Sequence, residues 1–532
     1  MKIKKFNFKD LVVLDMANNH QGSLDHGLNI VSSLSKVVKE NNMRAAIKFQ
    51  FRNLPDFVHS DDRNSEDNKH VPRFLSTMLD WKDFKKLKDS VVKEGMLSMC
   101  TPFDEYSVQK IIEMEFDIIK VASCSAKDWP LLEKIASSNL PIIASTGGLT
   151  LSEVDDLVSF FRHKGCDFAL MHCVAIYPTP DSFCNLGNIS DFKKRYKDIT
   201  IGWSTHEPPE EYFHAGLALA LGAEIFERHV GLESDGVVLN KYSSNPVQVD
   251  TWLKALNKSR NLIGSYSRLD SPKEEYESLD SLKRGVFASR KINEGDKIDE
   301  NNTYFAFPYR KGQMSSGEFK IGSISKKQIE IDEPLYPKDF EVESDSEAII
   351  LKKAIHEVKA MISYAGISLN NDFSTEYSHH YGISNFREVG AVLINLINRE
   401  YCKKILVQLP GQSHPAHYHK IKEETFIVVW GELISNLEGR EKTLVPGDTL
   451  LVPPGAWHSF RTETGCIFEE ISTTAISGDS VYRDENINKL SSNQRKTMVD
   501  FWGRFQIDQQ LRKASIPSNV KKIKPIKQST SK

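Results

Sequence analysis

The stretch ITIGWSTHEPPEEYFHAGLALALGAEIFERH (199–229) decides the fold, because it holds one complete unit of a pattern that recurs from residue 11 onward. A short apolar segment is followed by a longer amphipathic segment and then by a second short apolar segment. Strands buried on both faces have such continuous apolar runs, and helices between them make neighbouring strands parallel. The other runs are LVVLDMA (11–17), RAAIKFQ (44–50), MLSMCT (96–101), DIIKVAS (117–123), PIIAST (141–146) and DFALMHC (167–173). Eight such strands predict an α/β fold, a (β/α)8 TIM barrel rather than an open sheet.

Polar residues stand at the carboxyl end of the predicted strands, where barrels of this type carry their catalytic groups. Lys48 and Lys120 end the second and fourth strands, and three hydroxyl residues end neighbouring strands: Thr101, Ser123 and Ser204. Convergent cationic and hydroxyl donors are what a small phosphorylated or carboxylated anion requires. The alternative for a barrel lysine is a Schiff base with the substrate, which needs a depressed pKa. Anion binding is the favoured interpretation.

Two histidines follow adjacent predicted strands. His206 comes after the seventh strand and His229 ends the eighth, so their imidazoles can converge on one divalent cation with open coordination positions. Two histidines alone are more often structural groups that make hydrogen bonds. The neighbouring Glu227 and Ser204 favour a metal site.

Composition excludes several classes of function. The chain has 532 residues, with 69 Lys+Arg against 72 Asp+Glu and a net charge of −3, and it offers no basic field for nucleic acid outside its last dozen residues. No apolar run approaches the ~18 residues of a membrane span, and we expect no membrane association and no export signal. The seven cysteines form no CxxC pair, which indicates reduced thiols and a cytoplasmic location.

The sequence pattern changes after the predicted barrel. A small β-rich module contains an approximate repeat, since SRKINEGDKIDENN (289–302) is echoed by SKKQIEIDEPLYPKD (325–339). Further on, short strands with Gly and Pro turns predict a small antiparallel barrel. A single helix is expected around Arg495–Phe505. The expected divisions are a barrel domain (1–270), the β-rich module (283–342), a helical connector (343–374), the antiparallel barrel (375–480) and a polar C-terminal tail (481–532).

Residues 10–342 resemble the sialic acid (N-acetylneuraminate) synthase family. The motifs that carry the resemblance, in order, are ANNHQGSL (17–24), AIKFQ (46–50), MCTPFDEYSV (99–108), IKVAS (119–123), PIIASTGG (141–148), LMHCVAIYPTP (170–180), IGWSTHE (201–207) and GAEIFERHVGL (222–232). KRGVFASRKINEGDKI (283–298) resembles the SAF (antifreeze-like) module that follows the barrel in that family.

The resemblance implies a condensation of phosphoenolpyruvate with an amino-sugar aldehyde to give a nonulosonic acid, with Mn²⁺ or Mg²⁺ as cofactor. It implies that Lys48, Thr101, Lys120, Ser123 and Ser204 hold phosphoenolpyruvate and that His206 and His229 hold the metal. Gln50, Tyr177 and Glu227 would then surround the sugar, and Asp15 would stand at a catalytic position at the end of the first strand. A homodimer is also implied, since the SAF module of the family caps the partner's barrel.

Five positions depart from the family's pattern. Asp15 replaces a Glu, Cys124-Ser125 replaces a Gly-Glu pair, Ala175 replaces an Asn, Leu239-Asn240 replaces an Asp-His pair and Phe307 replaces the Arg that reaches the partner's sugar site. The residues for the anion and the metal are kept, whereas those for the acceptor sugar are changed. We therefore expect an unusual acceptor, with loss of activity as the alternative.

The segment GQSHPAHYHKIKEETFIVVWG (411–431) fits the cupin pattern G-x5-H-x-H-x4-E-x6-G, and GDTLLVPPGAWHSF (447–460) fits its second motif. Alternate residues of a strand face one side, so His417 and His419 point into the barrel, where Glu424 and His458 complete a shell for a second divalent metal (Mn, Fe, Ni or Zn).

This second half also resembles small sugar isomerases in HYG (380–382) and IFEEIST (467–473). Its candidate bases are Glu424 and one of Glu469 and Glu470, because alternation turns only one of that pair inward.

The sequence thus predicts a metal-dependent synthase of nonulosonic acids joined to a cupin that acts as an isomerase or only binds. Two rivals stay open. One is an aldolase that does not use phosphoenolpyruvate, and the other is a sugar-binding regulatory protein with a degenerate barrel.

Overall fold

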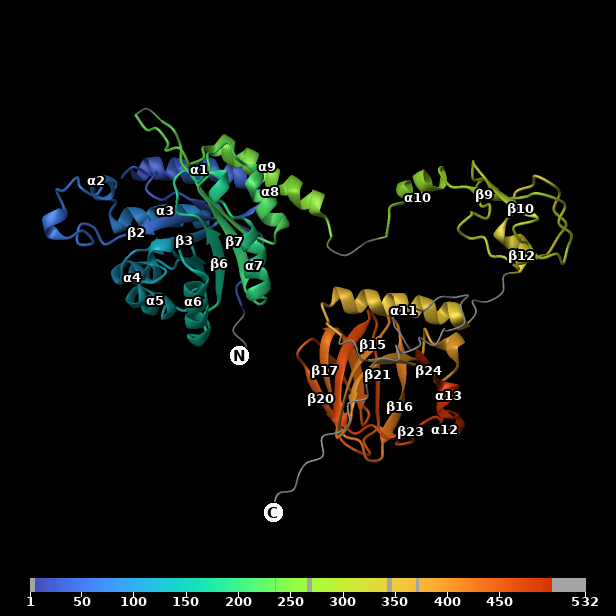
Figure 1. The fold of residues 1–532 in the computed structure, drawn as a ribbon. Coiled ribbons are helices and arrows are strands. Elements are labelled where there is room, and N and C mark those ends of the chain that lie inside the picture. The colour runs from blue at the N-terminus through green and yellow to red at the C-terminus, as the bar shows by residue number, and fades with distance from the viewer. Residues whose placement is uncertain (1–4, 235, 266–269, 342–346, 370–372, 500–532) are drawn as a thin grey trace, which may run out of the picture. The chain divides into compact units, whose positions relative to one another are not determined.

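The computed structural model describes residues 5–234, 236–265, 270–341, 347–369 and 373–499 (Figure 1). The chain divides into two compact units, Met1–Asp270 and Ser271–Lys532. No helix within the described ranges is both long enough and apolar enough to cross a membrane.

The first unit is a closed barrel of eight parallel strands in sequential order, in which β1 pairs with both β2 and β8. The strands are β1 (Leu11–Asp15), β2 (Arg44–Phe51), β3 (Leu97–Pro102), β4 (Ile118–Val121), β5 (Ile142–Ser145), β6 (Phe168–Cys173), β7 (Thr200–Thr205) and β8 (Ile225–His229). The helices of this unit are α1 (Leu24–Glu40), α2 (His70–Ser76), α3 (Trp81–Lys93), α4 (Glu105–Glu113), α5 (Trp129–Ala136), α6 (Leu151–His163), α7 (Gly187–Arg195), α8 (Phe213–Ala220) and α9 (Pro246–Ile263). The predicted TIM barrel is confirmed.

Strand parity decides which side chains enter the barrel. Leu11, Val13 and Met99 belong to the core inside the barrel, whereas Val12 and Leu14 belong to the core between strands and helices. The interior is tightly filled, since a Cβ at Gly202 of β7 would lie 2.4 Å from the sulfur of Met171. Residues two positions beyond an inward apolar residue therefore lie inside as well, at the carboxyl end of the barrel.

The β-rich module begins the second unit and has its own small core around Val286, Ile292 and Ile329. Its elements are α10 (Lys273–Asp280), β9 (Gly285–Ala288), β10 (Thr303–Ala306), β11 (Ile324–Ser325) and β12 (Phe340–Glu341), with β9 paired to β10 and β11 to β12. The two halves of the sequence repeat lie against each other, because Ile292 bridges to Ile329.

The remaining strands form two antiparallel sheets, of seven strands (β20-β17-β22-β15-β14-β13-β24) and five strands (β19-β18-β21-β16-β23). Their bounds are β13 (Ser374–Ser378), β14 (Ala391–Asn398), β15 (Tyr401–Gln408), β16 (Ser413–His419), β17 (Glu424–Gly431), β18 (Leu433–Leu437), β19 (Arg440–Leu444), β20 (Thr449–Val452), β21 (His458–Arg461), β22 (Cys466–Thr473), β23 (Ser480–Tyr482) and β24 (Lys496–Val499). The helices are α11 (Glu347–Tyr364), α12 (Glu485–Lys489) and α13 (Ser492–Arg495). The expected antiparallel β architecture is confirmed.

Two expectations about the flanks need correction. Helix α11, expected only as a connector, shares one core with the sheet, since Ile355 and Val358 pack in the same cluster as Tyr377 and Val407. The expected helix at Arg495–Phe505 is wrong for residues 496–499, which form β24 and pair with β13; residues 500–532 lie outside the described residues. Helix α11 covers an apolar face of the sheet, and β24 covers the open edge of β13.

Candidate functional sites

A buried network of two lysines and two carboxylates lies at the carboxyl end of the barrel. Lys48 Nζ donates to Glu227 Oε1 and lies 3.0 Å from Asp15 Oδ2. Lys120 Nζ lies 3.0 Å from Glu227 Oε2 and donates to Ser145 Oγ at 2.5 Å. All four charged side chains are at least 93% buried. Each charge thus has a partner, which buried ions require.

The network fixes the protonation of its members. Burial raises the pKa of Glu227, but Lys120 and Lys48 outweigh it and hold that pKa well below its usual range. Burial likewise lowers the pKa of Lys48, and Asp15 and Glu227 more than reverse this. For Lys120 burial wins, and its pKa lies below the ordinary value. Lys120 is therefore the cation that a further anion at this site would stabilise most.

His206 and His229 lie side by side, with ring centres 5.3 Å apart. His206 Nδ1 lies 2.8 Å from the carbonyl oxygen of Val174, and His229 Nδ1 lies 3.3 Å from Asp15 Oδ2. A carbonyl or carboxylate on Nδ1 fixes the tautomer and leaves Nε2 as the lone-pair nitrogen, which is how metal-binding histidines are held. Burial and then His229 lower the pKa of His206 to about 3, so its imidazole is neutral. The pair fits a divalent cation.

Two tyrosines border this histidine pair. The ring of Tyr177 lies 4.2 Å from that of His206, and Tyr242 contacts the rings of both histidines and of Tyr177. Burial raises the pKa of both tyrosine hydroxyls, which are thus protonated hydrogen-bond donors at neutral pH.

Two of the three predicted hydroxyl residues, Thr101 and Ser204, lie near the carboxyl ends of β3 and β7, and Ser123 lies in the turn just after β4. Thr101 Oγ1 is buried and makes no hydrogen bond within the described structure. Ser123 Oγ accepts a hydrogen bond of 3.0 Å from the backbone N–H of Gly147. Ser204 is buried at the end of β7, level with Glu227 on β8. An unpartnered buried hydroxyl beside two lysines suits an anionic ligand.

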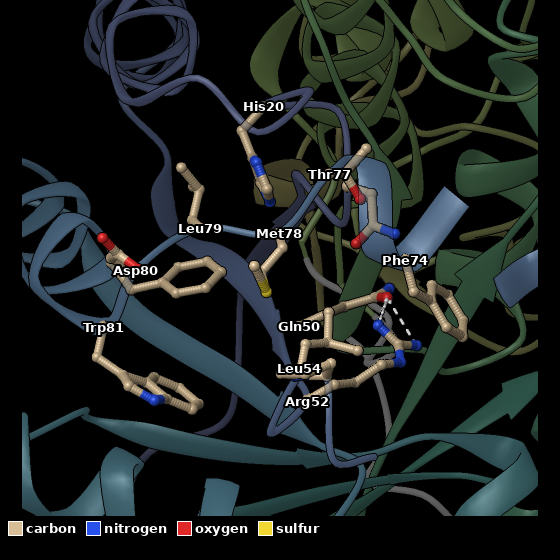
Figure 2. Close-up of a pocket in the computed structure, with 13 residues that line it drawn as sticks. His20, Gln50, Arg52, Leu54, Phe74, Thr77, Met78, Leu79, Asp80 and Trp81 are labelled. Carbon is tan, nitrogen blue, oxygen red and sulfur yellow. Dashed lines mark hydrogen bonds between the residues drawn. The ribbon is translucent and has the colours of Figure 1, made fainter. Parts of the chain in front are cut away.

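Gln50 is not joined to the lysine network by any hydrogen bond of the described residues. Its side-chain oxygen accepts from both terminal nitrogens of Arg52, at 3.3 and 3.4 Å (Figure 2). Both residues line a cavity of about 210 Å³, together with Asn18, His20 and Thr77. The barrel mouth therefore has a side pocket next to the ionic network.

The positions that depart from the family pattern differ in their settings. Asp15 lies within the network, and Ser125 is buried in the turn after β4, next to the exposed Cys124. Ala175 is exposed on the loop after β6, and the Phe307 side chain is 62% exposed in the β-rich module. Leu239 lies against Gly231, just after β8.

The second candidate site lies between the two sheets of the cupin-like unit. Three imidazoles, from His417, His419 and His458, bring ligand nitrogens within 4.8 Å of one another, and all three residues are buried. His417 Nδ1 and His458 Nδ1 are held by backbone carbonyls at 3.0 and 3.1 Å.

Glu424 faces the same point. Its carboxylate oxygens lie 3.1 Å from His419 Nε2 and 3.4 Å from His458 Nε2. Those two nitrogens and Glu424 Oε2 are buried and have no hydrogen-bond partner among the described residues. Two unsatisfied imidazole nitrogens and one unsatisfied carboxylate oxygen, together with the adjacent imidazole of His417, fit a transition-metal ion.

A buried lysine lies beside these four residues. Lys422 Nζ forms an ion pair with Glu424 and lies 3.0 Å from Glu470 Oε1. Glu470 is 3% exposed, whereas its neighbour Glu469 pairs with Lys403 at 2.9 Å on the other face of β22. Burial lowers the pKa of Lys422, and Glu470 and Glu424 raise it above the ordinary value by a larger amount.

Several residues of the two sites have no signal in the strand-end pattern. Arg52 and Tyr242 reach the barrel mouth from loops. Arg52 stands two residues after the motif AIKFQ, and Tyr242 lies in none of the quoted motifs. Lys422 stands two residues before Glu424 inside the cupin motif, at a position that the pattern leaves free. The sequence could have indicated Lys422 by its position two residues before Glu424, at the start of β17.

Comparisons with known proteins agree with this geometry. Residues 39–268 match the NeuB family, and residues 405–468 match the cupin domain. A solved structure from Chromobacterium violaceum, described as spore coat polysaccharide biosynthesis protein E, is 40% identical, with a TM-score of 0.61; the match covers 63% of this chain and 100% of that one.

Two curated relatives are more distant. The N-acetylneuraminate-9-phosphate synthase of Drosophila melanogaster is 27% identical over 318 residues, which cover 54% of this chain and 84% of the relative. The N,N'-diacetyllegionaminic acid synthase of Campylobacter jejuni is 25% identical over 338 residues, which cover 61% of this chain and 98% of the relative. The chain has a closed eight-stranded barrel, matches the NeuB family model, and is 40% identical to the Chromobacterium violaceum protein over the whole length of that protein. The chain therefore belongs to the NeuB family.

Proposed function

We propose that the barrel is a nonulosonic acid synthase that condenses phosphoenolpyruvate with an amino-sugar aldehyde and depends on Mn²⁺ or Mg²⁺. The observation that carries the proposal is the buried network of Lys48, Asp15, Glu227 and Lys120 next to two oriented histidines. The curated relatives named as N-acetylneuraminate-9-phosphate and legionaminic acid synthases support the same reaction class.

In this proposal the donors at the strand ends bind phosphoenolpyruvate. Lys48 and Lys120 neutralise its phosphate and carboxylate, and Thr101, Ser123 and Ser204 donate hydrogen bonds to their oxygens. His206 and His229 would hold the cation, which polarises the aldehyde oxygen when bound. The methylene carbon (C3) of phosphoenolpyruvate then attacks the aldehyde carbon, and the aldehyde oxygen takes up a proton. Water adds to C2, which carries the phosphate ester, and phosphate leaves from C2 to give the keto acid.

The remaining residues orient the acceptor and manage protons. Tyr177 and Gln50 offer hydrogen bonds to the sugar from opposite sides of the network. Glu227 stays ionised between the two lysines, so it accepts a hydrogen bond from the substrate or its attacking water. No covalent bond between enzyme and substrate is needed.

The test is metal-dependent release of inorganic phosphate from phosphoenolpyruvate across a panel of amino-sugar aldehydes, with the nonulosonate detected by mass spectrometry. We expect Lys120→Met and His206→Ala to abolish release without unfolding the chain. Lys127→Met is the matched control, since Lys127 pairs with Glu153 on the surface. Carbon–carbon bond formation without phosphate release would favour the simple aldolase, and binding without any turnover would favour the regulatory protein.

We further propose that the cupin is a metal-dependent sugar isomerase. The buried Glu470, held by Lys422 and by Ser472 Oγ at 3.1 Å, shares Lys422 with the proposed metal ligand Glu424. As a base it would take the proton from the carbon beside a carbonyl and return it to the carbonyl carbon. The hydroxyl proton of that neighbouring carbon would pass to the former carbonyl oxygen, and Lys422 would hydrogen bond to both oxygens.

Exchange of deuterium from solvent into an amino sugar or sugar phosphate measures this activity directly. We expect Glu470→Gln to remove the exchange and Glu469→Gln, on the outer face of the same strand, to keep it. Exchange that survives Glu470→Gln would assign the cupin a binding role.

For the whole chain we propose a homodimer, with the β-rich module in the role of a SAF module, and a reducing compartment such as the cytoplasm, in line with the seven free cysteines. Light scattering at assay concentration tests the dimer, and an active monomer would contradict it.

A further inference from the structure

Arg52 is held rigidly at the mouth of the barrel. It directly follows β2, and its guanidinium carbon lies 3.9 Å from the ring centre of Phe74 and 3.7 Å from that of Phe103. Stacking on two aromatic rings restricts the planar group while leaving its edge available for hydrogen bonds. In Figure 2 this edge meets the Gln50 side chain at the cavity, with Phe74 alongside.

The guanidinium has no counter-ion in direct contact within the described part of the chain. Among the residues that the structure describes, no carboxylate forms an ion pair with Arg52, and its Nε is buried without a hydrogen-bond partner. The carboxylate of Asp104 is instead used by the backbone N–H groups of Asn53 and Ser107, at 2.8 and 2.7 Å. Burial lowers the pKa of Arg52 to about 10, and the more distant charges of Cys124, Asp104 and Asp15 offset this only in part.

The surroundings of this guanidinium add to its positive potential. Burial and then the charges of Lys69, Arg52 and Arg73 lower the pKa of His70, which stacks on Phe74. Arg73 also acts on His20, which lines the cavity. Asp80 is the carboxylate that lines the cavity, and it is exposed. A cavity of about 210 Å³ with this field is large enough for a small ionised group rather than a single water molecule.

We infer that Arg52 binds an anionic group, a phosphate ester or a carboxylate, carried by the acceptor sugar, and that this enzyme thereby selects charged acceptors. A guanidinium edge presents paired N–H donors that match the oxygens of either group. The inference rests on the proposed synthase function, because it places the acceptor against Gln50.

The experiment separates binding from turnover. The ligands are three N-acyl amino alditols: one neutral, one with a terminal phosphate ester and one with a terminal carboxylate. They lack the aldehyde and cannot condense. Each is titrated by calorimetry into the full chain with Mn²⁺ and saturating phosphoenolpyruvate, so that the lysine site is already filled.

We expect at least one anionic alditol to bind about 10- to 100-fold more tightly than the neutral one. Arg52→Gln removes that difference, Arg52→Lys keeps part of it, and the affinity for phosphoenolpyruvate is unchanged. The matched control is Arg63→Gln, because Arg63 lies on the same loop and pairs with the exposed Asp56 at 3.1 Å. The preferred anionic alditol identifies the group as phosphate or carboxylate.

Equal binding of all three alditols to the wild type would overturn the inference, and so would an anion preference that survives Arg52→Gln. Loss of phosphoenolpyruvate affinity in Arg52→Gln would assign the residue to the other substrate and overturn it as well. If the proposed function is wrong, no aldehyde leads to phosphate release, whichever alditols bind. That result is distinct from the binding results above.

Discussion

Asp15 joins the two halves of the barrel site. One carboxylate oxygen of this residue lies 3.0 Å from Lys48 Nζ and 3.3 Å from His229 Nδ1, although the side chain is one carbon shorter than the Glu of the resembling family. The same oxygen thus contacts a lysine of the proposed anion site and a histidine of the proposed metal site. We therefore expect a change at Asp15 to affect the binding of both the anion and the metal.

We expect Asp15→Asn to weaken Mn²⁺ binding about 10- to 100-fold, because a partner that fixes a ligand's tautomer is worth that much affinity. Titration calorimetry with the metal alone measures it. Asp61→Asn, an exposed carboxylate on the loop after β2, is the control. Unchanged Mn²⁺ affinity in Asp15→Asn would show that His229 does not need this contact.

The pocket residue His20 gives a prediction for pH. Burial, then His26 and Arg73, lower its pKa to about 4, and its Nδ1 accepts a hydrogen bond of 3.1 Å from the N–H of Gly22. The unfolded chain protonates this histidine near pH 6.5 and the folded chain does not. Its contribution to stability is therefore complete above about pH 6.5 and is lost as the pH falls toward about 4.

Denaturant unfolding of the metal-free protein at several pH values between 7 and 5 checks this. The free energy of unfolding should fall less steeply with decreasing pH in His20→Gln than in the wild type, by up to about 1.4 kcal/mol per pH unit. Parallel curves would mean that His20 is protonated in the folded barrel.

At this scale the sequence could predict residues whose position follows from strand parity. Lys48, Glu227 and His229 lie two or four residues beyond an inward apolar residue, and the structure brings them together. Arg52 and Tyr242 could not be predicted in this way, because loops have no period that fixes the direction of a side chain.

Helix α11 is an element whose importance lies in its buried face. Leu351, Ile355 and Val358 recur at helical spacing and pack on the seven-stranded sheet. The amphipathic pattern was visible in the sequence, but its target was not, since a periodic face shows that something covers it and not what does. The strand β24 has the same limitation, because its partner β13 lies more than a hundred residues earlier.

We expect Ile355→Ala to lower the stability of the cupin-like unit by about 2–5 kcal/mol, through lost burial and the cavity left behind. His356→Ala, on the exposed side of the same helix, should have little effect. Calorimetry should show the loss in one transition, with the barrel's transition unchanged. A shift of both transitions would mean that the two units unfold together.

The whole molecule offers two candidate metal sites of different chemistry. Three imidazoles and a carboxylate in the cupin favour transition metals, whereas two histidines next to carboxylates in the barrel leave room for substrate oxygens and suit Mn²⁺ or Mg²⁺. The ligands lie in separate units of the chain, so neither site borrows a residue from the other.

Metal analysis of His417→Ala/His419→Ala tests this independence. We expect the double variant to lose about one equivalent of transition metal and to keep metal-dependent phosphate release in the barrel assay. Full metal content would contradict the cupin site. Loss of metal and of all phosphate release together would contradict the independence of the two sites.

Lys422 places a positive charge from the chain itself beside Glu424, the carboxylate proposed as a metal ligand. Lys422 pairs with Glu424 and Glu470, and Lys404 Nζ lies 3.5 Å from Glu470 Oε1, so two lysines of the chain face these two carboxylates. A metal ion at the proposed site would compete with Lys422 for the Glu424 carboxylate, and we expect the two sheets around this site to fold without metal.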